Sequence, residues 1–177
     1  WRKQVNLDHV FKKTKTALKK RESTTTVPDG LLCRCSRCKK PILVQEVRDA
    51  YYICPKCGGY FKVRAYERIR RVADEGTFQE SDRELVGENP LGFEGYEEKL
   101  AAERLKTRMK EAIVTGTGSI DGIPAALGVM DSRFMMASMG WAVGEKLTRL
   151  IEKATTENLP LILFTCSGGA RMQEGIH

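Results

Sequence analysis

The chain has 177 residues, of which 41% are hydrophobic and 30% charged, as in a globular protein with one domain or a small module joined to part of a larger one. It has no apolar run of about 18 residues, which argues against a membrane-spanning helix, and we expect a cytoplasmic protein without a secretory signal. The formal net charge of +7 is uneven: residues 1–70 carry eighteen Lys and Arg against six Asp and Glu, whereas residues 71–177 carry twelve against seventeen. This split predicts two units, the basic one suited to an anionic cofactor, nucleic acid or an acidic protein surface.

The basic part divides into a tail and a cysteine-rich module. Residues 1–30 are predicted to form a basic tail or short amphipathic helix that ends in a linker, a pattern that equally suits a solvated tail without a ligand. Residues 31–62, the cysteine module, combine short β-like runs at 42–44 and 51–53 with cysteine-containing turns.

The remaining residues, 63–177, predict an α/β domain. Apolar residues at helical spacing predict helices over 63–75, 96–110 and 141–157, and the second of these should bury Tyr96, Leu100, Leu105 and Met109. The runs 112–117 and 124–130 predict a hairpin, because the Asp121-Gly122 pair between them favours a type I′ turn with two positive φ angles. The continuous apolar run 160–166 is typical of a buried strand.

The cysteine module contains two Cys-x-x-Cys pairs, Cys35 with Cys38 and Cys54 with Cys57, separated by fifteen residues. This spacing is that of a zinc ribbon, in which four thiolates hold a structural Zn²⁺ and leave no open position for catalysis. Cys33 is an alternative to Cys35 as a ligand, but its spacing to Cys38 suits a tight turn poorly, so we expect it to be a bystander. A redox disulfide is the less favoured use of either pair.

A second chemical feature is the run from Ser167 to Glu174, in which Gly168 and Gly169 follow the apolar strand. If the glycines open a helix that begins near Arg171, their backbone N–H groups would face a substrate and stabilise an oxyanion. The simpler interpretation is a strand-to-helix turn that needs glycine only for its conformation. The run has neither the Gly-x-Gly-x-x-Gly pattern of dinucleotide sites nor the Lys of a P-loop.

The sequence offers no obvious general base. Its two histidines, His9 and His177, lie in the tail and at the last position, and neither Ser167 nor Cys166 has a base beside it in sequence. Chemistry that relies on backbone N–H groups suits these residues better than a catalytic triad does.

Four features occur in an order found in one known family. They are the two cysteine pairs, the segment from Asp131 to Gly140, the helix beginning Val143-Gly144-Glu145-Lys146, and the run from Ser167 to Gly175. In this combination the chain, from about Pro28 onward, resembles the carboxyltransferase β subunits of bacterial-type acetyl-CoA carboxylase. The resemblance implies an α/β fold of the crotonase-like class, a superhelix of ββα units. It divides the chain into a basic tail (1–30), a zinc ribbon (31–62) and the N-terminal part of an acyl-CoA carboxyltransferase domain (63–177).

The family's reaction moves a carboxyl group from carboxybiotin, held on a biotin carboxyl carrier protein, to acetyl-CoA, giving malonyl-CoA for fatty acid biosynthesis. The resemblance implies that the Gly168 and Gly169 amides hold the thioester oxygen, with the freed biotin as base, and that Met139 and Gly140 line the acyl-CoA pocket. It also implies a carboxyltransferase α subunit as partner, in an α2β2 heterotetramer. Basic residues of the ribbon would meet the phosphates of coenzyme A or cover the mouth of the active site.

The sequence departs from the family's pattern in three places and in length. Met136 and Ala137 stand where the family usually has glycine, and Trp141 stands where it commonly has a small residue, so each of these could narrow the pocket. Because the family's subunit continues for roughly another hundred residues, we expect a truncated domain that is inactive alone. The alternative function is that of a zinc-ribbon protein that binds nucleic acid through its basic part.

Overall fold

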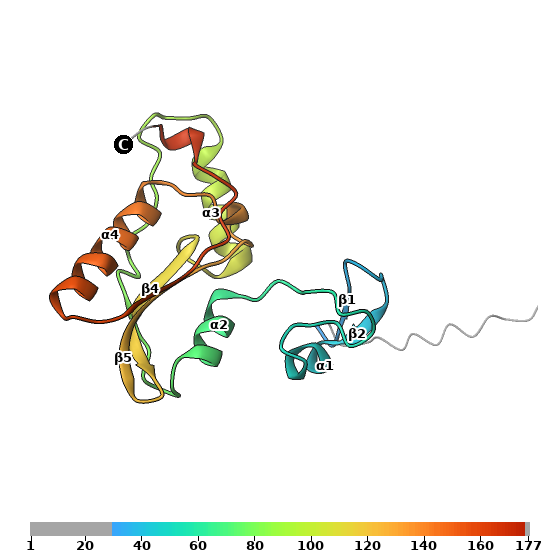
Figure 1. Ribbon diagram of the computed structural model, residues 1–177. Coiled ribbons are helices and arrows are strands. Elements are labelled where there is room, and N and C mark those ends of the chain that lie inside the picture. Colours follow the sequence, from blue (N-terminus) through green and yellow to red (C-terminus); the bar gives the residue numbers. More distant parts are fainter. Residues whose placement is uncertain (1–29, 176–177) are drawn as a thin grey trace, which may run out of the picture.

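The computed structural model describes residues 30–175, so all of the predicted tail except Gly30 and both histidines lie outside the described part. Within that part, no helix is long and apolar enough to cross a membrane. The described residues form two small sheets, one in the cysteine module and one in the residues that follow it (Figure 1).

The cysteine module is built on a short hairpin. Strands β1 (Leu32–Arg34) and β2 (Pro41–Leu43) pair antiparallel, and helix α1 (Val44–Asp49) follows directly. The β-like run predicted at 51–53 is reduced to one bridge, between Ile53 and Tyr60. The module's buried core is small and consists of Cys35, Ile42, Val47 and Cys54.

The second sheet has four strands in the order β3 (Gln79–Ser81), β4 (Ile113–Ile120), β5 (Ile123–Met130) and β6 (Leu161–Phe164). The first three are antiparallel neighbours, whereas β5 and β6 run parallel. Helix α4 (Trp141–Thr156) makes the connection between β5 and β6, which gives one β-β-α unit followed by the first strand of the next. In Figure 1, α4 and α2 (Ala65–Val72) flank the β4–β5 hairpin on opposite sides, and α3 (Tyr96–Thr107) lies toward one end of it.

The hairpin turn agrees with the prediction. Asp121 and Gly122 have φ of 50° and 79°, as a type I′ turn requires. Their N–H groups donate to the two carboxylate oxygens of Asp74, at 3.0 and 2.9 Å. The Asp74 carboxylate therefore stabilises the turn in addition to the turn's own conformation. Together they fix the register of β4 and β5.

Strand β6 lies where the apolar run predicts a strand, but it is not buried. The side chains of Leu161 and Leu163 are 38% and 39% exposed. Within the described residues β6 pairs only with β5, so its outer edge has no neighbour to cover it. An apolar run predicts a strand that is suited to burial, but it does not predict which other element packs over that strand.

The segment between β5 and α4 turns sharply. Met135, Met136 and Ala137 all have positive φ, of 44°, 55° and 56°. This left-handed region is one that glycine enters freely and other residues at a cost. The Met136 side chain is exposed, and Ala137 is fully buried in the core. Met136 and Ala137 are therefore held in a strained backbone conformation.

Candidate functional site

The four predicted cysteine ligands lie together. The Sγ atoms of Cys35, Cys38, Cys54 and Cys57 are all within 4.8 Å of one another. The Cys35–Cys57 pair is separated by 3.7 Å and the Cys38–Cys54 pair by 3.9 Å. A tetrahedral ion with Zn–S bonds of about 2.3 Å requires sulfurs about 3.8 Å apart, so the donor set and its spacing fit a zinc ion. The cluster can therefore bind a metal.

The surroundings of the four cysteines shift the pKa values of Cys35 and Cys57 in opposite directions. Hydrogen bonds from the backbone, that of Cys38 foremost, lower the pKa of Cys35 to about 6. At Cys57 the Gly59 amide opposes the trend, but burial and the three neighbouring cysteines raise the pKa to about 11. The turn after Cys57 closes through Gly58, which has a φ of 67° and donates its N–H to the Cys54 carbonyl at 2.9 Å.

Cys33 lies outside the four-cysteine cluster, as expected. Its thiol donates to the Ile42 carbonyl at 3.6 Å, across the β1–β2 hairpin, and it packs against the module's core. It therefore offers a natural comparison for the four clustered cysteines.

The glycine turn follows β6. Within the described residues, which end at Gly175, it is followed by a single 3₁₀ turn at Met172–Glu174. Both amides have partners: the Gly168 N–H donates to the Met136 carbonyl at 2.9 Å and the Gly169 N–H to the Ser167 hydroxyl at 3.1 Å. The second acceptor is a side chain that can rotate away, so the Gly169 amide is the more readily freed.

The structure brings the two predicted substrate-contacting segments together. The Met139 N–H donates to the Gly169 carbonyl, and the Met139 carbonyl accepts from the Arg171 N–H, both at 2.8 Å. This bridge places Met139 and Gly140 directly beside the glycine turn. A cavity of about 510 Å³ opens there, and the residues that line it are Met139, Gly140, Trp141, Gly144, Glu145, Thr148, Ala170, Arg171, Glu174 and Gly175.

Sequence reasoning missed a buried ion network in the wall of this cavity. Arg171, in the segment after the glycine turn, forms ion pairs with two carboxylates. One belongs to Glu174 of the same segment and the other to Glu111. Burial opposes the charge on Arg171, but the Glu111 carboxylate outweighs it and raises the pKa of the guanidinium. Tyr96 donates its hydroxyl to Glu174. The only indication of this network in the sequence is that Arg171 and Glu174, which carry opposite charges, lie close together in a segment typical of a turn.

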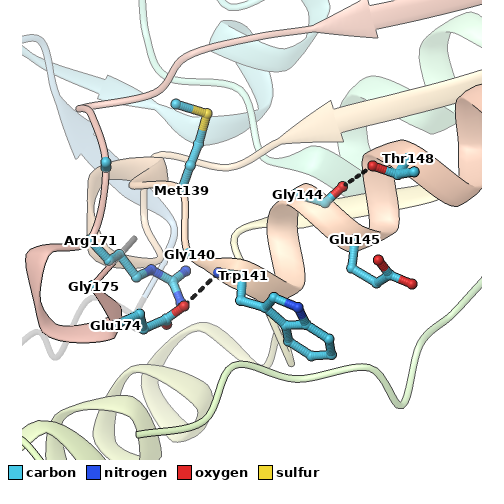
Figure 2. A pocket seen from close by; sticks show the side chains of 10 residues that line it. Met139, Gly140, Trp141, Gly144, Glu145, Thr148, Arg171, Glu174 and Gly175 are labelled. Atoms are coloured by element: carbon cyan, nitrogen blue, oxygen red, sulfur yellow. Dashed lines mark hydrogen bonds and ion pairs between the residues drawn. The ribbon is translucent and has the colours of Figure 1, made fainter. Parts of the chain in front are cut away.

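Glu174 also completes the start of α4. Its Oε2 accepts the backbone N–H of Trp141, the first residue of the helix, at 2.5 Å. Figure 2 shows the Arg171 and Glu174 side chains meeting beside this N–H group, with the Trp141 indole directed away from them. The N-cap residue of α4, Gly140, offers no side chain, so the first backbone N–H group of the helix is bonded to a carboxylate from a distant segment instead.

Gly140 makes this arrangement possible. A Cβ atom at Gly140 would collide with the Glu174 carboxylate, whereas a Cβ at Gly144, one turn later in α4, would meet nothing within 4 Å. Gly140 is therefore required for close approach and not for a special φ, since its backbone is extended. Gly140, which the sequence predicts as a pocket residue, is thus packed against the Glu174 carboxylate of the buried ion network.

The matched pair Gly140→Ala and Gly144→Ala tests this contact. Gly140→Ala is expected to lower the free energy of unfolding by about 1–3 kcal/mol, because Glu174 must move away from the Trp141 N–H. Gly144→Ala is expected to raise it by about 0.5–1 kcal/mol, because alanine favours a helix interior. Urea denaturation of both variants gives the two values, and equal effects would contradict the contact.

The β-β-α unit, with a glycine turn beside a cavity, fits the crotonase-like class of carboxyltransferases. A family model described as "Carboxyl transferase domain" matches residues 62–177, and the chain belongs to this family. Among solved structures, it is similar to transcarboxylase 12S with methylmalonyl-coenzyme A and methylmalonic acid bound, at 30% identity and a TM-score of 0.55, over 64% of this chain and 20% of that one.

Curated relatives narrow the comparison. The chain is 52% identical over 167 residues to the acetyl-coenzyme A carboxylase carboxyl transferase subunit beta of Carboxydothermus hydrogenoformans, which covers 94% of the chain and 60% of the relative. It is 53% identical over 151 residues to a Natranaerobius thermophilus protein named for subunits beta/alpha, over 85% of the chain and 25% of that protein. A Desulforamulus reducens beta subunit is 46% identical, over 94% of the chain and 61% of its own length. The chain thus spans about three fifths of the length of the two beta subunits.

Proposed function

We propose that this chain is the carboxyltransferase β subunit of acetyl-CoA carboxylase, which forms malonyl-CoA from acetyl-CoA for fatty acid biosynthesis. The observation that carries the proposal is the 52% identity over 94% of the chain to a relative of that name. Its partners would be a carboxyltransferase α subunit, in an α2β2 heterotetramer, and the biotin carboxyl carrier protein. The relative named for both subunits supports the pairing with α. Free thiols for a metal site favour the cytoplasm.

At the glycine turn, this chain would bind the acetyl thioester and stabilise its oxygen. The Gly169 N–H, once released by the Ser167 hydroxyl, would donate to the thioester oxygen as negative charge develops there. The Gly168 N–H would join it by exchanging the Met136 carbonyl for the substrate. Carboxybiotin, supplied by the carrier protein, provides the carboxyl group when bound. The acetyl methyl group would lose its proton to the biotin freed of its carboxyl group, so no side-chain base of this chain is required, and the backbone donors would stabilise the resulting enolate oxygen.

Met139 and Gly140 would form the wall of the acyl-CoA pocket. Both line the cavity beside the turn, and their backbone is tied to Gly169 and Arg171 by the two hydrogen bonds of the bridge. Trp141 lines the same cavity and is 45% exposed, so its ring would be available to the bound thioester. We also propose that the metal in the four-cysteine cluster is a structural Zn²⁺, since four cysteine ligands leave no open coordination position.

The variant Gly168→Val tests the proposed role of the turn. A Cβ at Gly168 would lie 3.1 Å from the Met136 carbonyl oxygen and 3.3 Å from the Met136 Cβ, so valine must displace the turn. In the full-length subunit assembled with α and loaded with zinc, we expect carboxyl transfer to fall at least about a hundredfold with zinc content unchanged. The measurement is the rate of malonyl-CoA formation from carboxybiotin and acetyl-CoA.

Gly122→Asn is the control, because it alters a positive-φ glycine in the hairpin turn and asparagine tolerates that conformation. It should retain the wild-type rate. Full activity in Gly168→Val would rule out the turn as the oxyanion site. A wild-type assembly that forms no malonyl-CoA would overturn the proposed function itself.

A further inference from the structure

The residues of the proposed site lie on two segments, the pocket segment (136–141) and the turn segment (168–174). Their backbones are joined in the middle, where Met139 donates to the Gly169 carbonyl and accepts from the Arg171 N–H, both at 2.8 Å. The proposed oxyanion amides belong to the turn segment, and the proposed wall of the acyl-CoA pocket belongs to the pocket segment. The contacts that join the two segments therefore set the distance between the amides and the wall.

Two side chains of the turn segment extend this connection toward α4. Arg171 donates from Nε to the Ser138 carbonyl at 3.1 Å. The Oε2 atom of Glu174 accepts the Trp141 N–H at 2.5 Å, one residue beyond Gly140 (Figure 2). Glu174 therefore makes the outermost contact between the two segments, at the point where the pocket segment enters the helix.

The Glu174 carboxylate is itself fixed in place. Its second oxygen, Oε1, accepts from the Tyr96 hydroxyl and from Nη1 of Arg171, the latter at 3.1 Å. Burial and the hydrogen bond to Glu174 raise the pKa of Tyr96 to about 12, so this hydroxyl remains a donor at neutral pH. The side chain of Glu174 is only 3% exposed. The carboxylate therefore cannot move without breaking one of three buried hydrogen bonds.

We propose that Glu174 is a positioning residue for carboxyl transfer, which holds the wall of the acyl-CoA pocket at the distance from the glycine amides that the enolate requires. The inference rests on the proposed function. Glu174 lines the cavity, but both of its oxygens are bonded to the protein, so it acts through the backbone of the pocket segment and not on the substrate. A misplacement of about 1 Å between a substrate and its catalytic groups lowers the rate roughly a hundredfold.

The variant Glu174→Gln tests the proposal in the full-length subunit assembled with α and loaded with zinc. The amide has the size of the carboxylate but only one acceptor oxygen. If that oxygen faces the Trp141 N–H, the NH₂ group faces the Arg171 guanidinium, and in the reverse orientation the NH₂ group faces the Trp141 N–H. One donor loses its acceptor in either case. We expect kcat to fall about a hundredfold, with the KM for acetyl-CoA within about twofold of the wild type.

Tyr96→Phe is a second, milder variant. It removes one of the three hydrogen bonds to Glu174 and changes no charge, so the carboxylate keeps its bonds to Arg171 and to the Trp141 N–H. We expect kcat to fall at least about threefold with the KM for acetyl-CoA unchanged. Urea denaturation shows whether each variant is folded, and Tyr96→Phe decides the question if Glu174→Gln is not.

Glu84→Gln is the control, because it makes the same change in a carboxylate that is 79% exposed, pairs with Lys110 and lies outside the cavity. It should retain the wild-type kcat and KM. A wild-type kcat in folded Glu174→Gln, in an assembly whose wild type is active, overturns the inference and leaves the proposed function standing. A change confined to KM also overturns it, because Glu174 would then serve substrate binding alone. An inactive wild type would instead contradict the proposed function.

Discussion

Replacing Cys54 with serine is expected to abolish stoichiometric zinc binding and to unfold the cysteine module. Apart from its cysteines, the module's core has only Ile42 and Val47 as fully buried side chains, with Tyr52 and Phe61 partly buried, which is too little apolar surface to fold it alone. Structural zinc sites contribute about 10–16 kcal/mol of apparent binding free energy at neutral pH, and in small modules this is folding free energy. The Sγ of Cys54 lies 3.9 Å from that of Cys38, so its loss opens the cluster.

Cys33→Ser is the matched control. It removes a cysteine of the same module whose thiol bonds to the Ile42 carbonyl outside the cluster, and it should retain one zinc ion per chain. Zinc content by atomic absorption and limited trypsin digestion at the module's lysines and arginines make the comparison. Equal zinc content in both variants would contradict the assigned ligand set. The core around Val129, Phe134 and Val143 belongs to a separate cluster, so it should stay folded in both variants.

Features encoded locally were predicted well from the sequence. The four-cysteine cluster follows from spacing alone, because a Cys-x-x-Cys turn places two sulfurs on one side of an ion. Three of the four predicted strand ends lie within one residue of the observed ends, and β4 continues three residues further than predicted, to Ile120. The agreement arises because Asp121-Gly122 determines both the turn type and the register. In each case a few adjacent residues determine the geometry.

Features that depend on distant contacts were predicted less well. Leu105 was assigned to the buried side of α3, yet it is 83% exposed. At 3.6 residues per turn it lies about 140° around the helix from the buried Leu100, so the assigned spacing was not that of one helix face. We expected the amides of the glycine turn to face a substrate, but the Gly168 N–H donates to the Met136 carbonyl and the Gly169 carbonyl accepts from the Met139 N–H. The partners of Arg171 lie on both sides of it in sequence, and Glu111 is sixty residues away. No local pattern reveals such a pair.

The variant Arg171→Met is expected to lower the free energy of unfolding by about 3–5 kcal/mol, the usual cost of breaking a buried ion pair. The side chains of Arg171 and Glu111 are fully buried, and that of Glu174 is nearly so. Methionine fills much of the same space beside Phe134, but it leaves two carboxylates without their cation. The remaining donors, such as the Ala112 N–H at 2.7 Å from Glu111, compensate only in part.

Arg149→Met is the control for the loss of one arginine. Arg149 pairs with Asp82 and Glu145, both at 2.8 Å, but its side chain is 47% exposed, so its removal should cost at most about 1 kcal/mol. Urea denaturation of both variants measures the difference. The double variant Arg171→Met/Glu111→Gln should recover part of the lost stability, because one of the two uncompensated charges is gone. A similar small cost for Arg171→Met and Arg149→Met would show that the network does not hold the glycine turn against the start of α4.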